Sequence, residues 1–196
     1  SLDQLHSILD QKTASGHGSP YIRGFTGNRT LAIIDGIRYN TATYRDGPNE
    51  YFSHIDSFTV DQIEVLYGPT SALYGSEGIG GTINVQTRAA AYRDRQPKRF
   101  SSAEQVVRVS SGDDSTVSRT AFEIGEGQRW GARFGVSAKK FGDVRAADLG
   151  KLLETGYSEL AYDGRLDIDL NDTLALPLLH QSLLQDDVPR THSTVF

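Results

Sequence analysis

Residues 60–88 read Val60-Asp-Gln-Ile-Glu-Val-Leu-Tyr-Gly-Pro-Thr-Ser-Ala-Leu-Tyr-Gly-Ser-Glu-Gly-Ile-Gly-Gly-Thr-Ile-Asn-Val-Gln-Thr-Arg88. The apolar residues of the first run alternate with polar ones, which predicts a strand. Gly68-Pro69 ends that strand, and the proline favours one helical turn over Thr70 to Tyr74. A second alternating run, Thr82 to Thr87, predicts another strand. We therefore expect two strands joined through a glycine-rich turn.

The glycines of this turn invite comparison with phosphate-binding loops. Gly75, Gly78, Gly80 and Gly81 allow close backbone approach, as such loops require. No Gly-Lys-Ser/Thr follows them, and their spacing is not Gly-x-Gly-x-x-Gly. The sequence therefore argues against nucleotide binding.

Composition excludes several function classes. The chain has 196 residues, no methionine and no cysteine, so we expect a segment of a longer protein that has no disulfides or thiolate metal sites. Its net charge of -5 argues against general nucleic-acid binding. No run approaches the roughly 18 apolar residues of a spanning helix, so any membrane role must fall to strands.

The chain before residue 60 predicts short elements. Apolar residues at helical spacing predict a helix over Leu2–Asp10, and the composition of Thr13–Pro20 predicts a loop. Leu31–Asp35 predicts a buried strand, and the pair Asp35-Gly36 predicts a hairpin turn into Ile37–Tyr39. To Asp35 we assign turn chemistry alone.

The second half of the chain changes to strict alternation. Even positions of Trp130–Lys139 are apolar and odd positions are glycine or polar, and Tyr162–Leu170 repeats the pattern. Weaker alternation lies in Gln105–Ser110 and Arg119–Gly125, and Asn171-Asp172 predicts a turn into a further strand. Such segments suit a transmembrane β-barrel, while a soluble β-sandwich gives the same alternation. Taken alone, the second half favours the sandwich.

Four motifs follow one another in the first half: Tyr21-Ile-Arg-Gly-Phe25, Thr30-Leu-Ala-Ile-Ile-Asp-Gly-Ile-Arg38, Ile63-Glu-Val-Leu-Tyr-Gly-Pro-Thr-Ser-Ala-Leu-Tyr-Gly-Ser76 and Gly80-Gly-Thr-Ile-Asn-Val85. In this order and spacing they resemble the plug domain of TonB-dependent outer-membrane receptors. The resemblance implies an α+β plug over 1–91, a linker over 92–99, and the first antiparallel strands of an incomplete transmembrane β-barrel over 98–196. The TonB box of that family is not visible upstream of Ser1.

The resemblance also implies a function. A receptor of this family sits in the outer membrane of a bacterial cell, contacts the lipid bilayer and transports a scarce nutrient. By family frequency the substrate is a small-molecule metal chelate, an iron-siderophore or haem. The energy comes from the TonB-ExbB-ExbD complex. No enzyme, cofactor, metal site or nucleic-acid partner is implied. The alternative is a soluble or cell-surface β-rich module that binds a ligand without transport.

Candidate ligand-binding residues lie in the long polar loop before residue 60. A loop of this length in a compact domain is more often functional than accidental, and aromatic faces with both signs of charge suit a polar chelate. We assign this role to the following residues: Tyr44, Arg45, Asp46, Asn49, Glu50 and Tyr51. His17 and His54 are alternatives as haem ligands, and Asp113-Asp114 is a weak calcium candidate.

Two residues are candidates for ion pairing between plug and barrel. The family commonly pairs two plug arginines with barrel glutamates, and Arg23 matches one of them. Tyr67 stands where the second arginine is common. Glu64 alternates away from the core and could pair with a lumen cation or face solvent.

If the second half forms a barrel, the two faces of the strand around residue 135 should tolerate arginine to different degrees. Arginine at Phe134 or Val136 would face lipid and destabilise the barrel by roughly 2–4 kcal/mol at bilayer depth. Arginine at Ser137 would face the lumen, and we expect it to be tolerated.

Overall fold

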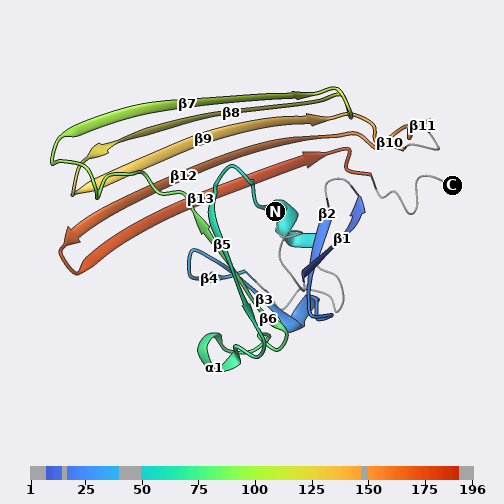
Figure 1. The fold of residues 1–196 in the computed structure, drawn as a ribbon. Coiled ribbons are helices and arrows are strands. Elements are labelled where there is room, and N and C mark those ends of the chain that lie inside the picture. The colour runs from blue at the N-terminus through green and yellow to red at the C-terminus, as the bar shows by residue number, and fades with distance from the viewer. Residues whose placement is uncertain (1–7, 15–16, 40–49, 147–149, 190–196) are drawn as a thin grey trace. The chain divides into compact units, whose positions relative to one another are not determined.

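The computed structural model describes residues 8–14, 17–39, 50–146 and 150–189. The chain forms two compact units, Ser1–Thr87 with Arg190–Phe196, and Arg88–Pro189. Figure 1 shows the strands of each unit, and each unit is described by itself. Among the described residues, no helix is long and apolar enough to cross a membrane.

A four-stranded sheet of order β4-β3-β6-β5 organises the first unit. Strands β3 and β6 run parallel, and the other neighbours are antiparallel. A separate hairpin pairs β1 with β2. The elements are β1 (Ile8–Ala14), β2 (His17–Ile22), η2 (Gly27–Arg29), β3 (Thr30–Ile34), β4 (Ile37–Arg38), η3 (Glu50–His54), β5 (Val60–Tyr67), α1 (Ser71–Tyr74) and β6 (Gly81–Thr87).

The stretch 60–88 folds as its sequence predicts. β5 and β6 pair antiparallel, and α1 lies between them in the chain. Gly75 closes α1 with φ 83°, a left-handed conformation that glycine adopts without a Cβ penalty. The predicted hairpin through Asp35-Gly36 is also confirmed, since β3 pairs with β4 on either side of it.

The core of the first unit lies on one face of this sheet. Ile22, Ile83 and Val85 are buried and packed together. Partly buried residues surround them, namely Ile34, Phe52, Ile55, Val60 and Val65. Fully burying one such aliphatic side chain contributes about 1.5–3 kcal/mol, so this small cluster holds the sheet to the β1–β2 hairpin and η3.

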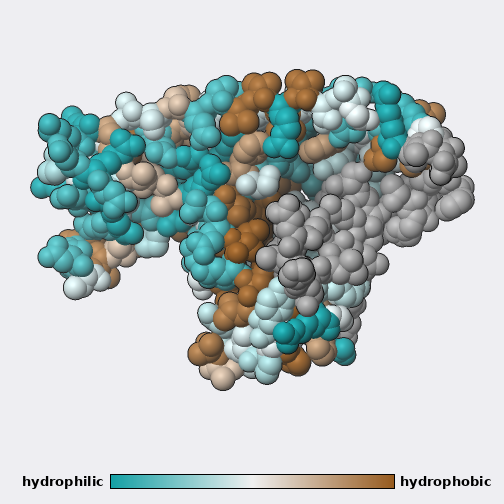
Figure 2. Space-filling model, in the orientation of Figure 1, coloured by the Kyte–Doolittle hydropathy of each residue, from teal (hydrophilic) through white to brown (hydrophobic). Residues whose placement is uncertain are grey.

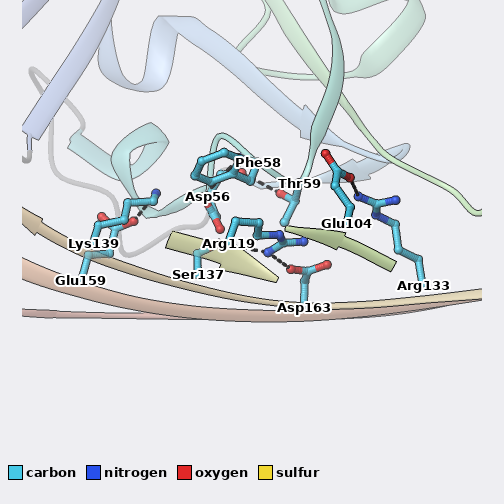
Figure 3. A network of polar contacts seen from close by, with 10 residues as sticks. All are labelled: Asp56, Phe58, Thr59, Glu104, Arg119, Arg133, Ser137, Lys139, Glu159 and Asp163. Atoms are coloured by element: carbon cyan, nitrogen blue, oxygen red, sulfur yellow. Dashed lines mark hydrogen bonds and ion pairs between the residues drawn. The ribbon is translucent and has the colours of Figure 1, made fainter. Parts of the chain in front are cut away.

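An aspartate turn leads into β5. Asp56 accepts a hydrogen bond from the backbone N–H of Phe58 at 3.1 Å, and the Thr59 hydroxyl donates to the Asp56 carbonyl at 2.7 Å (Figure 3). Asp56 and Thr59 are both buried. The polar side chains here therefore satisfy backbone groups that a buried turn would otherwise leave without partners.

Two predictions for the start of the chain are wrong where the structure describes it. The end of the predicted helix, Ile8–Asp10, is instead the start of β1, and residues 1–7 lie outside the described part. The predicted loop contains His17–Pro20, which belong to β2. Ile8 pairs with Ile22 across the hairpin. Backbone pairing to a neighbouring strand overrides the helical pattern, because isolated helices of this length are marginal.

The second unit is one antiparallel sheet of order β13-β12-β9-β8-β7. Figure 1 shows its long strands side by side in a single curved layer. The strands run from 12 to 15 residues, longer than their alternation predicts. They are β7 (Arg99–Ser110), β8 (Ser115–Glu126), β9 (Trp130–Phe141), β12 (Tyr157–Asn171) and β13 (Leu174–Asp186), with a short hairpin of β10 (Arg145–Ala146) and β11 (Gly150–Lys151).

Candidate functional site

One face of the five-stranded sheet, here called the apolar face, exposes large hydrophobic side chains. Its members are Val107, Val109, Phe122, Ile124, Phe134, Val136, Leu160, Tyr162, Leu176, Leu178 and Leu184. Figure 2 shows hydrophobic side chains reaching the surface along the upper edge of the view, where the second unit lies in Figure 1. A soluble sandwich would cover these side chains with a second sheet, so their exposure favours the barrel alternative over the sandwich.

The opposite face, here called the polar face, carries charged residues that pair across neighbouring strands. Arg119 on β8 donates through one Nη1 to Ser137 Oγ on β9 at 3.1 Å and to Asp163 Oδ1 on β12 at 2.5 Å (Figure 3). Arg119 is only 1% exposed. Its guanidinium crosses β9 over Gly135, where a Cβ would overlap it. The absence of a side chain at position 135 therefore makes room for this ion pair.

Further ion pairs extend the polar face from β7 to β13. Arg133 pairs with Glu123 and, at 3.1 Å, with Glu104. Lys139 pairs with Glu159 at 2.5 Å, as Figure 3 also shows. Two more contacts lie on the polar face: Arg165 to Asp167 at 2.8 Å, and Gln185 to Glu159 at 3.1 Å.

The charges on this face largely neutralise one another. Each of the four cations named above has a carboxylate partner on its own strand, on a neighbouring strand or, for Arg119, one strand further across the sheet. Several of these side chains are less than a tenth exposed, Arg133 and Glu159 among them. Removing one partner of such a pair leaves an uncompensated charge, which costs about 3–5 kcal/mol when the site is buried. The polar face can therefore line a polar interior without presenting large unbalanced charge.

Sequence reasoning found part of the polar face. Alternation assigns Arg133, Ser137 and Lys139 to one side of β9, and the structure confirms it. It did not predict that Arg119 and Asp163, which lie 44 residues apart, pair with each other. Pairing of that kind depends on strand register, which no local pattern reveals. The expectation that arginine is tolerated at Ser137 is wrong, because Ser137 is fully buried and accepts a hydrogen bond from Arg119.

Arg23 lies at the tip of a tight turn in the first unit. Ile22 and Phe25 exchange two backbone hydrogen bonds of 2.9 Å, and Arg23 and Gly24 both have positive φ, of 50° and 84°. These are the features of a two-residue hairpin turn. The exposed guanidinium of Arg23 stands 5.2 Å from the centroid of the Tyr67 ring, within cation–π range. Tyr67, which stands where the family commonly has the second arginine, therefore contacts Arg23.

Glu64 lies elsewhere on β5. Its two carboxylate oxygens accept hydrogen bonds of 3.0 Å from Gln62 and from Asn84 on β6. The structure therefore gives Glu64 partners inside its own sheet and does not bring it together with Arg23. The ion pairing predicted for these two residues stays a prediction.

The predicted ligand-binding loop is only partly described. Tyr44, Arg45, Asp46 and Asn49 lie outside the described residues. Glu50 and Tyr51 begin η3, and His54 ends it. His17 begins β2. Within the described part of the chain, no group of three or more histidine or acidic residues could hold a metal ion. The chelate-binding role of this loop stays a prediction.

Asp35 binds the end of β6 in addition to forming the hairpin turn. Its carboxylate accepts a hydrogen bond from the backbone N–H of Thr87 at 2.8 Å and another from the Thr87 hydroxyl at 2.6 Å. Thr87 is the last residue of β6. Asp35 therefore fixes the point at which the chain leaves the first unit, and the assignment to turn chemistry alone is wrong.

Most of the first unit matches a known family model. Residues 1–82 match the TonB-dependent Receptor Plug Domain. The chain is 36% identical over 108 residues to a vitamin B12 transporter, BtuB, of Vibrio vulnificus, covering 55% of this chain and 16% of that protein. It is 36% identical over 98 residues to an iron-regulated outer membrane virulence protein of Vibrio cholerae, covering 48% and 15%. The chain spans about a sixth of the length of these relatives.

Solved structures share the fold of both units. The copper transporter OprC superposes with a TM-score of 0.76 at 17% identity, covering 94% of this chain and 27% of OprC. The pyoverdine receptor FpvA of Pseudomonas aeruginosa, bound to pyoverdine, gives a TM-score of 0.64 at 20% identity, covering 91% and 24%. At such identities the likeness concerns the fold: a plug-type mixed sheet followed by antiparallel strands.

Proposed function

Residues 1–82 are a plug domain of the TonB-dependent receptor family, and from this premise we propose that the chain belongs to an outer-membrane receptor that actively transports a scarce nutrient. In this proposal residues 1–91 form the plug, residues 92–99 the linker, and residues 98–196 the first strands of the surrounding barrel. The receptor works with the TonB-ExbB-ExbD complex as its source of energy. The relatives named above are transporters and an outer membrane protein, which favours transport over catalysis.

The two faces of the five-stranded sheet carry this proposal. In a barrel wall the apolar face contacts lipid and the polar face lines the interior, which is the arrangement that transmembrane barrels require. Half-exposed Phe134 and Val136 on the first face, and paired Arg119 on the second, fit these environments. A soluble binding module would have to hide the apolar face in some other way.

The substrate we propose is a small metal chelate. The relatives include a vitamin B12 transporter and an iron-regulated protein, so a corrinoid and a ferric siderophore are both chemically reasonable, with haem as a further iron chelate. The assigned loop residues, Tyr44 to Tyr51, offer aromatic and charged groups for such a ligand.

Uptake by the full-length receptor tests the function. The receptor is expressed in a Gram-negative strain that lacks its own cobalamin and siderophore receptors, and radiolabelled cyanocobalamin and ferric enterobactin serve as probes. We expect energy-dependent accumulation of one probe, and loss of accumulation in a strain without TonB. Equal uptake with and without TonB would contradict active transport. Recovery of the full-length protein in the soluble fraction without detergent would favour the binding module instead.

A further inference from the structure

The segment that follows the first unit is fastened to the sheet of the second unit. Tyr92, which is 1% exposed, donates its hydroxyl to Asp169 Oδ1 at 2.8 Å. Arg93 donates to both oxygens of the same carboxylate, at 2.7 Å and 3.1 Å. Bidentate, charge-assisted bonds of this kind are the stronger hydrogen bonds in proteins. One carboxylate near the end of β12 therefore binds two consecutive residues of the connecting segment.

Backbone contacts reinforce this attachment. The N–H of Gln128, in the turn between β8 and β9, donates to the Tyr92 carbonyl at 2.9 Å, and the N–H of Gly127 donates to the Lys98 carbonyl at 3.0 Å. Gly131 has no side chain, and a Cβ there would lie 2.7 Å from the Tyr92 ring. The connecting segment is thus bound to the sheet near its start, at Tyr92, and near its end, at Lys98. The Tyr92 ring packs over Gly131, where a larger residue would leave no room for it.

The other end of the connection is fastened within the first unit. Asp35 binds the N–H and the hydroxyl of Thr87, as described above, and its own N–H donates to the Val85 carbonyl at 2.9 Å. Asp35 adopts φ 48°, a left-handed conformation that aspartate and asparagine tolerate better than most residues. The last strand of the first unit is therefore held to β3 at the point where the chain leaves it.

Only residues 88–91 separate these two attachments. Five residue steps join Thr87 to Tyr92, so their Cα atoms can be at most about 18 Å apart in any arrangement of the two units. A force that reaches β6 must therefore pass through a short tether that carboxylates hold at both ends.

We propose that Asp35 and Asp169 are positioning residues that clamp the two ends of the plug-to-barrel connection, so that β6 stays tethered to the barrel wall while the upstream part of the plug is displaced during transport. The proposal rests on the function proposed above. In this view the connecting segment is a fixed anchor for the plug and not a slack linker.

Pulling on the plug tests the Asp169 clamp. The full-length receptor in a lipid bilayer is held by its N-terminus in single-molecule force spectroscopy. In the wild type we expect a final, separate rupture as the segment leaves Asp169. This rupture frees the chain from Tyr92 to the start of β7 at Arg99, seven residue steps that add at most about 25 Å of length. In Asp169→Ala that last step should be absent, and in Tyr92→Phe it should occur at lower force.

Matched variants separate the clamp from general instability. Asp172→Asn removes another carboxylate in the β12–β13 turn, for which the described structure records no ion pair, and we expect it to keep the final step. Asp35→Asn keeps a residue that tolerates positive φ, and it should lower the force at which β6 is released. A wild-type trace without this final step, or the same step in Asp169→Ala, would overturn the proposal.

Failure of the clamp and failure of the transport function give different results. A final rupture step in a receptor that takes up neither probe would leave the clamp in place and refute the proposed transport of these probes. Normal TonB-dependent uptake with no final step would refute the clamp alone. The heat-dependent mobility of each variant on a denaturing gel shows whether its barrel is folded. If Asp169→Ala does not fold, Tyr92→Phe alone tests the clamp.

Discussion

Replacing Phe134 with arginine tests whether the apolar face contacts lipid. Phe134 lies near the middle of the 12-residue strand β9, opposite Phe122 and Gly164 on the neighbouring strands, and is 51% exposed. Twelve residues at about 3.4 Å each, tilted by about 40°, cover roughly 30 Å of bilayer depth. Position 134 is therefore near the midplane, where arginine costs about 2–4 kcal/mol.

Ala138 supplies a matched control on the same face of the same strand. On the same arithmetic Phe134 lies roughly 4 Å from the middle of β9, and Ala138 lies roughly 6–7 Å from the middle on the other side, nearer to an interface. Arginine at Ala138 should therefore cost less than at Phe134, because the cost falls from about 2–4 kcal/mol at the midplane towards about 0–1 kcal/mol at the interfaces. The two variants of the full-length receptor are compared by urea unfolding in phospholipid vesicles, with heat-dependent gel mobility as the measure of folded barrel. No loss of stability at Phe134 would refute a lipid-facing strand, because a water-facing sheet would accept arginine at both positions.

Three further changes test the polar face and the connecting segment. Gly135→Ala should displace the Arg119 guanidinium and lower the unfolding free energy by about 1–3 kcal/mol, while Gly164→Ala, whose Cβ would make ordinary 3.4 Å contact with a ring, serves as control in the same urea titration. Ser137→Arg should lower the yield of folded barrel, because it sets a second cation against a buried one. Burial, and then the bond to Asp169, raise the pKa of Tyr92 to about 12. The contribution of Tyr92 to stability should therefore be complete below pH 10 and disappear as pH rises through about 12, and Tyr92→Phe should reduce the tyrosinate absorbance change near pH 12.

The structural role of the segment between the units cannot be predicted from its own sequence. Arg88–Lys98 is polar and basic, as surface linkers commonly are, and nothing in its periodicity marks Tyr92 as buried. The burial of Tyr92 depends on residues that are distant in the sequence. Its hydroxyl binds Asp169, 77 residues away, and its ring packs against Gly131. The sequence predicts a boundary near this segment, and the contacts that fasten it become visible only when distant strands are aligned.

The sequence alone determined the local elements. The Gly-Pro turn, α1 and the strands β5 and β6 follow from residue types within a few positions of one another, because turn geometry and side-chain alternation are local properties. The alternation of β9 and β12 likewise separated an apolar from a polar face. The four motifs of the first half resemble a plug domain, and residues 1–82 match the model of that family.

The tertiary structure decided which residues meet. A pattern of period two says that Arg119 and Asp163 are both polar-face candidates, but only the register of three strands brings them to 2.5 Å. Slipping one strand by a single residue would turn its polar side chains to the other face, so register is fixed by the whole sheet and not by any one strand. The same reason explains β1, where pairing with β2 replaced the helix that the local pattern predicts, and Asp35, whose carboxylate binds Thr87 far along the chain.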